Sequence, residues 1–423
     1  MASTKALEAP KIRLDDRGFS FGTANGDFSV QLKGVLQVDS RTFFNDTGTA
    51  GNDGILLRRA RPILQGTVFR DFDFQFVPDF GGTSPQIFDA YLNYRYRPEL
   101  QFQAGKFKVP VGLEQLQADK DILFNERGLP TDLVPNRDLG FELHGDLFDG
   151  SVNYAAGIFN GVGDARNSSN GDFEDNKEFA GRVFFQPFKK SSALVLQGLG
   201  FGVSGSYGDM QTANTTGLPS TTGGTLAGFT TEGQQQFFAY NPVAVGSKTP
   251  IVVGAGGHRR LSPQGYYYYG PFSLLGEYVI SDQEVSRTVA EPLKTAVLDN
   301  TAWQIQAGWV LTGEDAAFVG GVVPRRPFKP SQGDWGAVQL VARYAQLNID
   351  PAAFPDFSDP ATSARSANEW SVGLNWWLSR NVRVSTSFSH TIFDGGGGTG
   401  TSAPASVTRK DENVLFTRVQ LAF

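Results

Sequence analysis

The chain has 423 residues and a net charge of −6 spread over both signs, which argues against nucleic acid binding, and it has no cysteine, which excludes disulfides. Its 50 Gly and 35 Phe against only 2 Met indicate a turn-rich, aromatic chain with little helix-forming material. No run approaches the roughly 18 apolar residues of a membrane helix, whereas a membrane strand needs only about ten residues with every second one apolar.

Strand periodicity begins in DFSVQLKGVLQVDSR, where one face is apolar over most of its length. The next two segments, LLRRARPILQGTVF and DFDFQFVPDF, are separated by Arg70 alone, which predicts a hairpin. Three more hairpins are predicted from FDAYLNYRYRP with LQFQAGKF, LGFELHGDLF with SVNYAAGIFN, and NEWSVGLNWWL with NVRVSTSFSHTIF. The remaining strands are predicted in KEFAGRVFFQPF, GLGFGVSGSYG, QGYYYYG, FSLLGEYVISDQ, NTAWQIQAGWVLTG, DWGAVQLVARYAQLN and NVLFTRVQLAF.

These segments amount to sixteen strands, an even number, as an antiparallel barrel with both termini on one side requires. The last strand ends on Phe423, an apolar terminus that a soluble chain rarely has. Trp303 and Trp309, like Trp370 and Trp376, are six residues apart on an apolar face, a spacing that suits two interfacial aromatic belts. A soluble β-sandwich would carry polar residues on that face. We therefore predict an all-β fold, a 16-stranded antiparallel transmembrane β-barrel.

Three connections are too long to be simple turns: about 108–138, 209–264 and 314–333. We expect them to fold into the lumen and constrict it, the third from the periplasmic side. The barrel is predicted over 27–423, and 1–26 is expected to be an N-terminal periplasmic extension. Because MASTKALEAPKIRLDDRG lacks the apolar core of a signal peptide, we expect the numbering to begin after processing.

Several stretches, taken in order, resemble the phosphate-selective porin O and P family: DFSVQLKGVLQVDSR, LLRRARPILQGTVF, FQAGKFKVPVGLEQL, LTGE at 311–314, PRRPFKPSQGDWGAVQLVARYAQL and the terminal strand. The resemblance implies a barrel in the outer membrane of a Gram-negative bacterium, a homotrimer, and a lumen lined with Arg and Lys that passes phosphate-like anions. It also implies that the outer-membrane assembly machinery reads the strand that ends at Phe423.

The RRAR cluster is the most informative charged motif. Alternation places Arg59 and Arg61 on the lumen face, roughly 6.6 Å apart, because a charge on the lipid face would cost about 2 to 4 kcal/mol at the midplane. Alternation places Arg58 on the other face of the strand, so it is expected near the end of its strand. The two lumen arginines could conduct anions, or they could brace the barrel by pairing with Asp71, Asp73 or Asp89.

Other cations are expected along the same ion pathway. In the first long connection, four cations face six carboxylates, which puts strict phosphate selectivity in doubt, whereas the other two connections are basic. Each loop cation could equally be an ordinary solvated charge. The full predicted pathway is Lys33, Arg59, Arg61, Lys106, Lys108, Lys120, Arg127, Arg137, Arg259, Arg260, Arg325, Arg326 and Arg343.

Enzymatic signatures are poor. His144, His258 and His390 lack metal-ligand spacing, no GxSxG or HExxH occurs, and GGGGTG at 395–400 is followed by no helix pattern, so no metal, cofactor or catalytic residue is predicted. The leading hypothesis is a passive porin for small hydrophilic solutes with an anion preference. The alternatives are a general porin without phosphate selectivity, a barrel enzyme that uses dispersed Ser, His and Asp, and a structural or adhesive barrel. The expected partners are outer-membrane lipid, small anionic solutes and two further copies of the chain.

Overall fold

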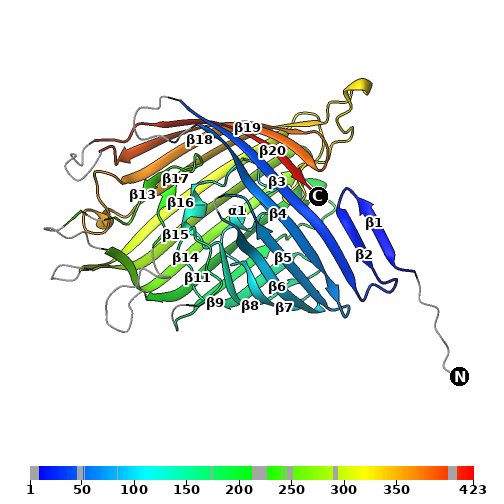
Figure 1. The fold of residues 1–423 in the computed structure, drawn as a ribbon, viewed down its shortest axis with the longest axis horizontal. Coiled ribbons are helices and arrows are strands. Elements are labelled where there is room, and N and C mark those ends of the chain that lie inside the picture. The colour runs from blue at the N-terminus through cyan, green and yellow to red at the C-terminus, as the bar shows by residue number, and fades with distance from the viewer. Residues whose placement is uncertain are drawn as a thin grey trace.

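The computed structural model describes residues 9–44, 51, 53–82, 84–172, 175–211, 226–241, 243–244, 251–288, 294–398 and 407–423. Its main sheet has 18 strands, of which two form an N-terminal hairpin and the other sixteen close into an antiparallel barrel (Figure 1). The hairpin consists of β1 (Lys11–Asp15) and β2 (Gly18–Gly22). The first eight barrel strands are β3 (Ser29–Phe44), β4 (Gly54–Val68), β5 (Phe72–Asp79), β6 (Gln86–Arg97), β7 (Leu100–Lys108), β8 (Arg137–Leu147), β9 (Val152–Phe159) and β10 (Glu178–Phe185). The other eight are β11 (Leu199–Gln211), β14 (Ile251–Tyr269), β15 (Phe272–Thr288), β16 (Lys294–Val310), β17 (Ala337–Asn348), β18 (Ala364–Trp377), β19 (Val382–Gly395) and β20 (Glu412–Ala422).

The barrel closes between its first and last strands. β20 pairs with β3 from Asn413 opposite Phe44 to Ala422 opposite Val35, and Phe423 exchanges both backbone hydrogen bonds with Gly34. A side chain at Gly34 would begin 3.1 Å from the Phe423 ring, so the absence of a Cβ there makes room for the terminal aromatic. The prediction that the C-terminal segment is the closing strand is confirmed.

The N-terminal hairpin continues the barrel wall beyond the end of β20. β2 pairs with the part of β3 that β20 leaves free, with Phe19 opposite Leu32 and Phe21 opposite Val30. The predicted extension over 1–26 therefore contains ordered strands between Lys11 and Gly22, which the sequence analysis did not assign.

The two ends of the barrel differ in their connections. The end that holds the N-terminal hairpin and Phe423, here called the turn end, carries the connections 69–71, 98–99, 148–151, 186–198, 270–271, 311–336 and 378–381. The opposite end, here called the loop end, carries those at 45–53, 80–85, 109–136, 160–177, 212–250, 289–293, 349–363 and 396–411. Most turn-end connections are short, as the sequence predicts, whereas 186–198 and 311–336 are longer.

The strands alternate between an apolar outer face and a polar inner face. Trp309 and Trp370 are exposed on the outside, where a membrane barrel meets lipid, whereas arginine, serine and glutamine side chains are buried inside. Among the described residues, no helix is long and apolar enough to cross a membrane. The helices are short: α1 (Leu113–Leu116), α2 (Leu194–Gln197) and the 3-10 turns η1 (Leu129–Leu133), η2 (Pro330–Gln332) and η3 (Pro351–Ala353).

One predicted loop is partly strand. The connection expected over 209–264 runs only from 212 to 250, because β14 begins at Ile251, well before its aromatic run. Its glycine-rich start, VVGAGG, hides the alternation that the sequence analysis relied on. Within this connection the structure describes β12 (Phe229–Thr230) and β13 (Gln236–Phe238), which form a small separate sheet.

The side-chain orientation predicted from alternation along β4 is wrong at Arg58. Gln37 of β3 pairs with Arg59, but the next residue, Val38, pairs with Leu57, so Arg58 is the extra residue of a β-bulge. A bulge shifts the alternation by one position and re-aims the side chain. Arg58 therefore points into the barrel beside Arg59 instead of lying near the strand end.

Candidate ion pathway

The segment 109–136 crosses the lumen and is tied to the far wall. Near its start, the backbone N–H of Leu113 donates to Glu277 Oε2 on β15 at 2.7 Å. Further on, Asn375 Nδ2 of β18 donates to the Leu123 carbonyl at 2.9 Å, and Ser385 Oγ of β19 donates to Asn125 Oδ1 at 2.7 Å. This constriction segment, with α1 inside the barrel in Figure 1, borders two cavities along the wall formed by β3 to β8.

A second inward segment, 226–241, packs on the constriction segment. The backbone N–H of Thr230 donates to Asp132 Oδ2 at 2.9 Å. Arg343 of β17 joins both segments to the wall, because its guanidinium lies 2.7 Å from Glu232, 3.3 Å from Glu369 and 3.8 Å from Glu114. With three carboxylates around it and no exposed side-chain surface, Arg343 is a brace and lies off the open pathway.

The arginines of β4 face the constriction segment across the open side of the lumen. Arg59 lies 3.4 Å from both Asp119 and Glu126, and Arg61 pairs with Asp79 at 2.6 Å and with Asp119. Burial alone would raise the pKa of Asp119, but Arg127, Arg59 and Arg61 together hold it well below its usual range. These arginines thus brace the loop against the wall, through Asp79, Asp119 and Glu126 instead of the predicted Asp71, Asp73 and Asp89.

Glu126 is the second anchor of the constriction segment. Arg58 reaches it at 2.6 Å and Arg418 of β20 at 2.8 Å, and Arg418 is also paired with Asp39 at 2.6 Å. Burial acts to raise the pKa of Glu126, but Arg58, Arg59 and Arg418 hold it well below its usual range. Sequence reasoning missed Arg58 and Arg418 as site residues. The alternation of NVLFTRVQLAF already placed Arg418 on the polar face and could have identified it.

Three cavities follow one another along the open side of the lumen. The first, of about 280 Å³, lies between β4 and the constriction segment; the second, of about 420 Å³, shares Arg61, Asp119 and Arg137 with it. The third, of about 720 Å³, opens at the turn end and shares Lys33, Lys120 and Phe423 with the second. The shared residues place the three cavities next to one another, and this series of cavities is called the route below.

Each cavity is lined by two more cations than carboxylates. The first has five arginines against Asp119, Glu126 and Asp132. The second has five basic residues against three acidic ones, and the third six against four. Because ion pairing removes part but not all of the positive charge, a positive excess persists along the whole route.

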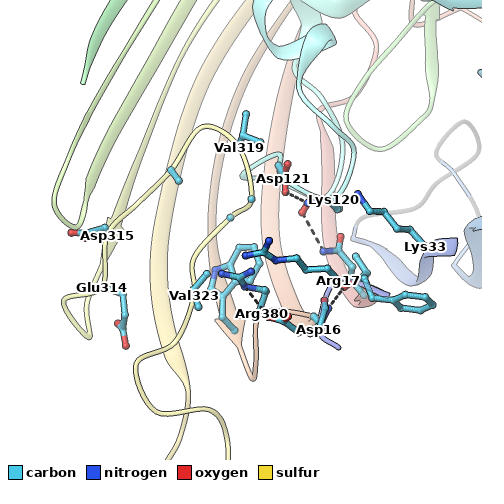
Figure 2. Close-up of a pocket in the computed structure, with 18 of the residues that line it drawn as sticks. Asp16, Arg17, Lys33, Lys120, Asp121, Glu314, Asp315, Val319, Val323 and Arg380 are labelled. Carbon is cyan, nitrogen blue, oxygen red and sulfur yellow. Dashed lines mark hydrogen bonds and ion pairs between the residues drawn. The ribbon is translucent and has the colours of Figure 1, made fainter. Parts of the chain in front are cut away.

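The long turn-end connection forms part of the wall of the third cavity. Gln117 Nε2 of the constriction segment donates to the Phe318 carbonyl at 2.9 Å, so the connection 311–336 reaches inward from the turn end. Figure 2 shows Glu314 and Asp315 on one side of this cavity and Lys33 on the other. The N-terminal hairpin and its turn contribute Arg13 and Arg17, two basic residues that sequence reasoning did not assign.

The predicted pathway residues divide into two groups. Those that line the three cavities are Lys33, Arg59, Arg61, Lys108, Lys120, Arg127, Arg137 and Arg325. Those that do not are Lys106, Arg259, Arg260, Arg326 and Arg343. Among the first group, Lys108 donates to the carbonyls of Gln115 and Gln117 at 2.7 and 2.6 Å and so also holds the start of the constriction segment.

The prediction that the HRR motif lies in a long connection needs correction. Arg259 lies on the outer face of β14, exposed and 3.6 Å from Asp282, because the motif is strand and not loop. Arg260 points inward but is held by Asp164 at 2.7 Å and by Glu178. Burial would raise the pKa of Asp164, yet Arg260 and His258 hold it at about 2, so this cluster is a closed ion-pair network.

Lys106 donates to the Ser168 carbonyl at 2.7 Å and so fixes the connection 160–177. Arg326 is exposed at the turn end, 3.9 Å from Asp334. Neither side chain lines the three cavities, and the pathway role expected for these two residues stays a prediction.

Comparison with known proteins gives a family and a fold. The profile of the family described as phosphate-selective porin O and P matches residues 30–423. No curated protein matches the sequence significantly. Among solved structures, the outer membrane channel DcaP of Acinetobacter baumannii has a TM-score of 0.57 at 9% identity, over 95% of this chain and 99% of that one.

Two further solved structures are similarly related. The anion-selective porin from Comamonas acidovorans has a TM-score of 0.54 at 12% identity, over 94% of this chain and 100% of that one. The trimer form of OmpT from Vibrio cholerae has a TM-score of 0.51 at 12% identity, over 94% of this chain and 99% of that one. At such identities the likeness is one of fold.

Proposed function

From the premise that the chain belongs to the phosphate-selective porin O and P family, we propose that it passes small anions, with phosphate or phosphorylated solutes as preferred cargo. The protein is an outer-membrane porin of a Gram-negative bacterium, and its family is one of channels rather than enzymes. The turn end then faces the periplasm and the loop end the exterior, as the short and long connections of outer-membrane barrels do.

The cation excess of the three successive cavities carries this proposal. An anion entering from the loop end meets Arg58, Arg59 and Arg61, then Lys108 and Lys33 nearer the turn end. Guanidinium groups bind phosphate oxygens in bidentate fashion and keep their charge, so they can replace hydration water in steps. The pairing of these arginines with Asp119 and Glu126 reduces the positive potential along this route and does not cancel it.

Reconstitution into planar bilayers tests the proposal. We expect discrete conductance steps in KCl, and we expect added inorganic phosphate to reduce the chloride current, because both anions compete for the same guanidinium groups. A bilayer that stays sealed at saturating protein would reject the channel. Phosphate that leaves the chloride current unchanged would favour a general porin.

We also propose that three copies assemble through the outer face of the first strands. Phe72, Phe74 and Phe76 lie on the outward side of β5, where Phe74 is directly opposite Gly66 of β4, a pairing of a bulky and a small residue that suits close packing. The trimer form of the related OmpT supports this state. Gentle detergent extraction followed by mass measurement tests it, and a single 45.9 kDa barrel would count against it.

The third proposal is that the assembly machinery of the outer membrane recognises the strand ending at Phe423. Its support is the exposed apolar row Leu415, Val419, Leu421 and Phe423 on the last strand. Removing Phe423 should slow insertion into the outer membrane of intact cells while refolding into detergent micelles continues. Equal insertion of both forms would argue that the terminal aromatic serves only the closure of the barrel.

A further inference from the structure

Phe88 is the one large apolar side chain among the lining residues of the smallest of the three cavities, most of which are charged or polar. Plain alternation along β6 would turn it outward, in phase with Ala90 and Leu92. However, Val77 of β5 pairs with Asp89 and the next residue, Pro78, pairs with Ile87, so Phe88 is the extra residue of a β-bulge. Such a bulge re-aims a side chain, and here it turns an aromatic ring toward the ion route.

The ring of Phe88 contacts two guanidinium groups. The Arg61 Cζ lies 4.1 Å from the ring centroid and the Arg137 Cζ lies 4.6 Å from it, both within the range of cation–π attraction. Arg61 and Arg137 also line both the first and the second cavity. Phe88 therefore touches both cations that mark the junction of the two cavities.

A ring and a carboxylate hold an arginine in different ways. Asp79 and Asp119 fix Arg61, and Asp89 fixes Arg137 at 2.8 Å, but each carboxylate also cancels one positive charge. The face of an aromatic ring attracts a guanidinium through its quadrupole and carries no net charge. A ring can thus orient two arginines without adding negative charge.

We propose that Phe88 is a positioning residue of the anion route, which holds Arg61 and Arg137 in place at the junction of the first and second cavities without neutralising them. This inference rests on the proposed anion-conducting function. It adds to that function a determinant of ion selectivity that carries no charge of its own.

The test is the chloride-to-potassium permeability ratio, measured from reversal potentials in a KCl gradient for wild type, Phe88→Leu and Phe88→Tyr. Leucine keeps an apolar side chain but lacks the ring, so the ratio should fall by about two- to fivefold, the factor that corresponds to a partly exposed cation–π contact. Tyrosine keeps the ring and should keep the ratio. If Phe88 only fills space, its replacement should change the conductance of both ions alike. A permeability ratio unchanged in both variants would therefore overturn the proposal.

Two controls separate the possible outcomes. Tyr96→Leu likewise removes a ring that faces a guanidinium, because the Arg97 Cζ lies 5.0 Å from the Tyr96 ring centroid. Tyr96 is exposed and lines none of the three cavities, so the ratio should stay at its wild-type value. In a background of Arg61→Gln and Arg137→Gln, Phe88→Leu should cause no further fall, and an equal fall there would overturn the proposal. A wild-type protein that prefers potassium would contradict the proposed function itself, independently of Phe88.

Discussion

Individual arginines in this barrel have two roles, and their partners distinguish them. Arg343 and Arg260 are enclosed by carboxylates and hold loops to the wall. Arg59 and Arg61 pair with the constriction segment and also line open space. The sequence left bracing and conduction as alternatives for these two residues, and the geometry is compatible with both at once.

Replacing Arg59 and Arg61 by Gln should therefore change selectivity and stability together. The anion preference should fall because two cations leave the route, and Asp119 would lose buried partners, a change that typically costs about 3 to 5 kcal/mol. Adding Asp119→Asn should recover much of the stability but not the anion preference. Reversal potentials and thermal unfolding of the detergent-solubilised barrel measure the two effects. If the double substitution leaves selectivity unchanged, the arginines act only as braces.

The ion pairs of Asp119 also predict a pH dependence. Because its pKa is lower in the folded protein than in the unfolded chain, Asp119 stabilises the fold above its unfolded value of about 3.9, and this contribution is lost as the pH falls through the folded pKa. The difference in melting temperature between wild type and Asp119→Asn should thus be constant from pH 8 to about pH 5 and shrink in stronger acid. A difference that already disappears between pH 7 and pH 5 would contradict the assigned pairing.

At the scale of elements, Asn125 is one of several residues that hold the middle of the constriction segment to the far wall. Asn125 accepts from Ser385 at 2.7 Å and donates to Ser387 at 3.4 Å, and Arg418 donates to its backbone carbonyl. Each neutral bond of this kind contributes on the order of 1 kcal/mol. Because the ion pairs of Glu126 hold the next residue, loss of the Asn125 side chain should loosen the segment without releasing it.

Asn125→Ala should widen the passage intermittently, because the middle of the segment would keep fewer contacts with β19. Single-channel traces should then show added excursions to higher conductance. Asn348→Ala, at the loop end of β17, is a matched control that should leave the traces unchanged. Traces of Asn125→Ala identical to wild type would show that the remaining contacts suffice to hold the segment.

The sequence predicted the elements better than their local irregularities. The sixteen strands, including the closing strand, could be predicted because apolar residues recur at every second position within each strand. The bulges at Arg58 and Phe88 could not be predicted in this way, because a bulge depends on pairing with the neighbouring strand. One extra residue in a strand turns the following side chains to the face opposite to the one that alternation predicts. Arg259 was misplaced for a related reason, since glycine interrupts the pattern at the start of β14.

The partners of the charged residues were harder still to predict. Asp119 and Arg61 are 58 residues apart in the chain, and Arg418 and Glu126 are 292 apart. Only the closed barrel with its inward segment brings such residues together. Charge counting along one loop gave the 108–138 connection an acidic balance, but that balance complements arginines on the wall that the loop faces.

For the whole molecule, the central claim is that the excess of cations along three joined cavities makes the pore prefer anions. This excess persists although the protein as a whole has a net charge of −6. The overall charge and the route therefore predict opposite ion preferences, and ions inside a pore respond mainly to the groups that line it.

One reversal-potential measurement on the wild-type protein in a KCl gradient across a planar bilayer tests this claim most directly. The sign of the potential reports which ion crosses more readily. We expect the sign of a chloride-selective pore, moderate in size because carboxylates partly offset the arginines, and shifted toward zero by raising the salt concentration on both sides, since salt screens the lining charges. A potassium-selective sign would contradict the account.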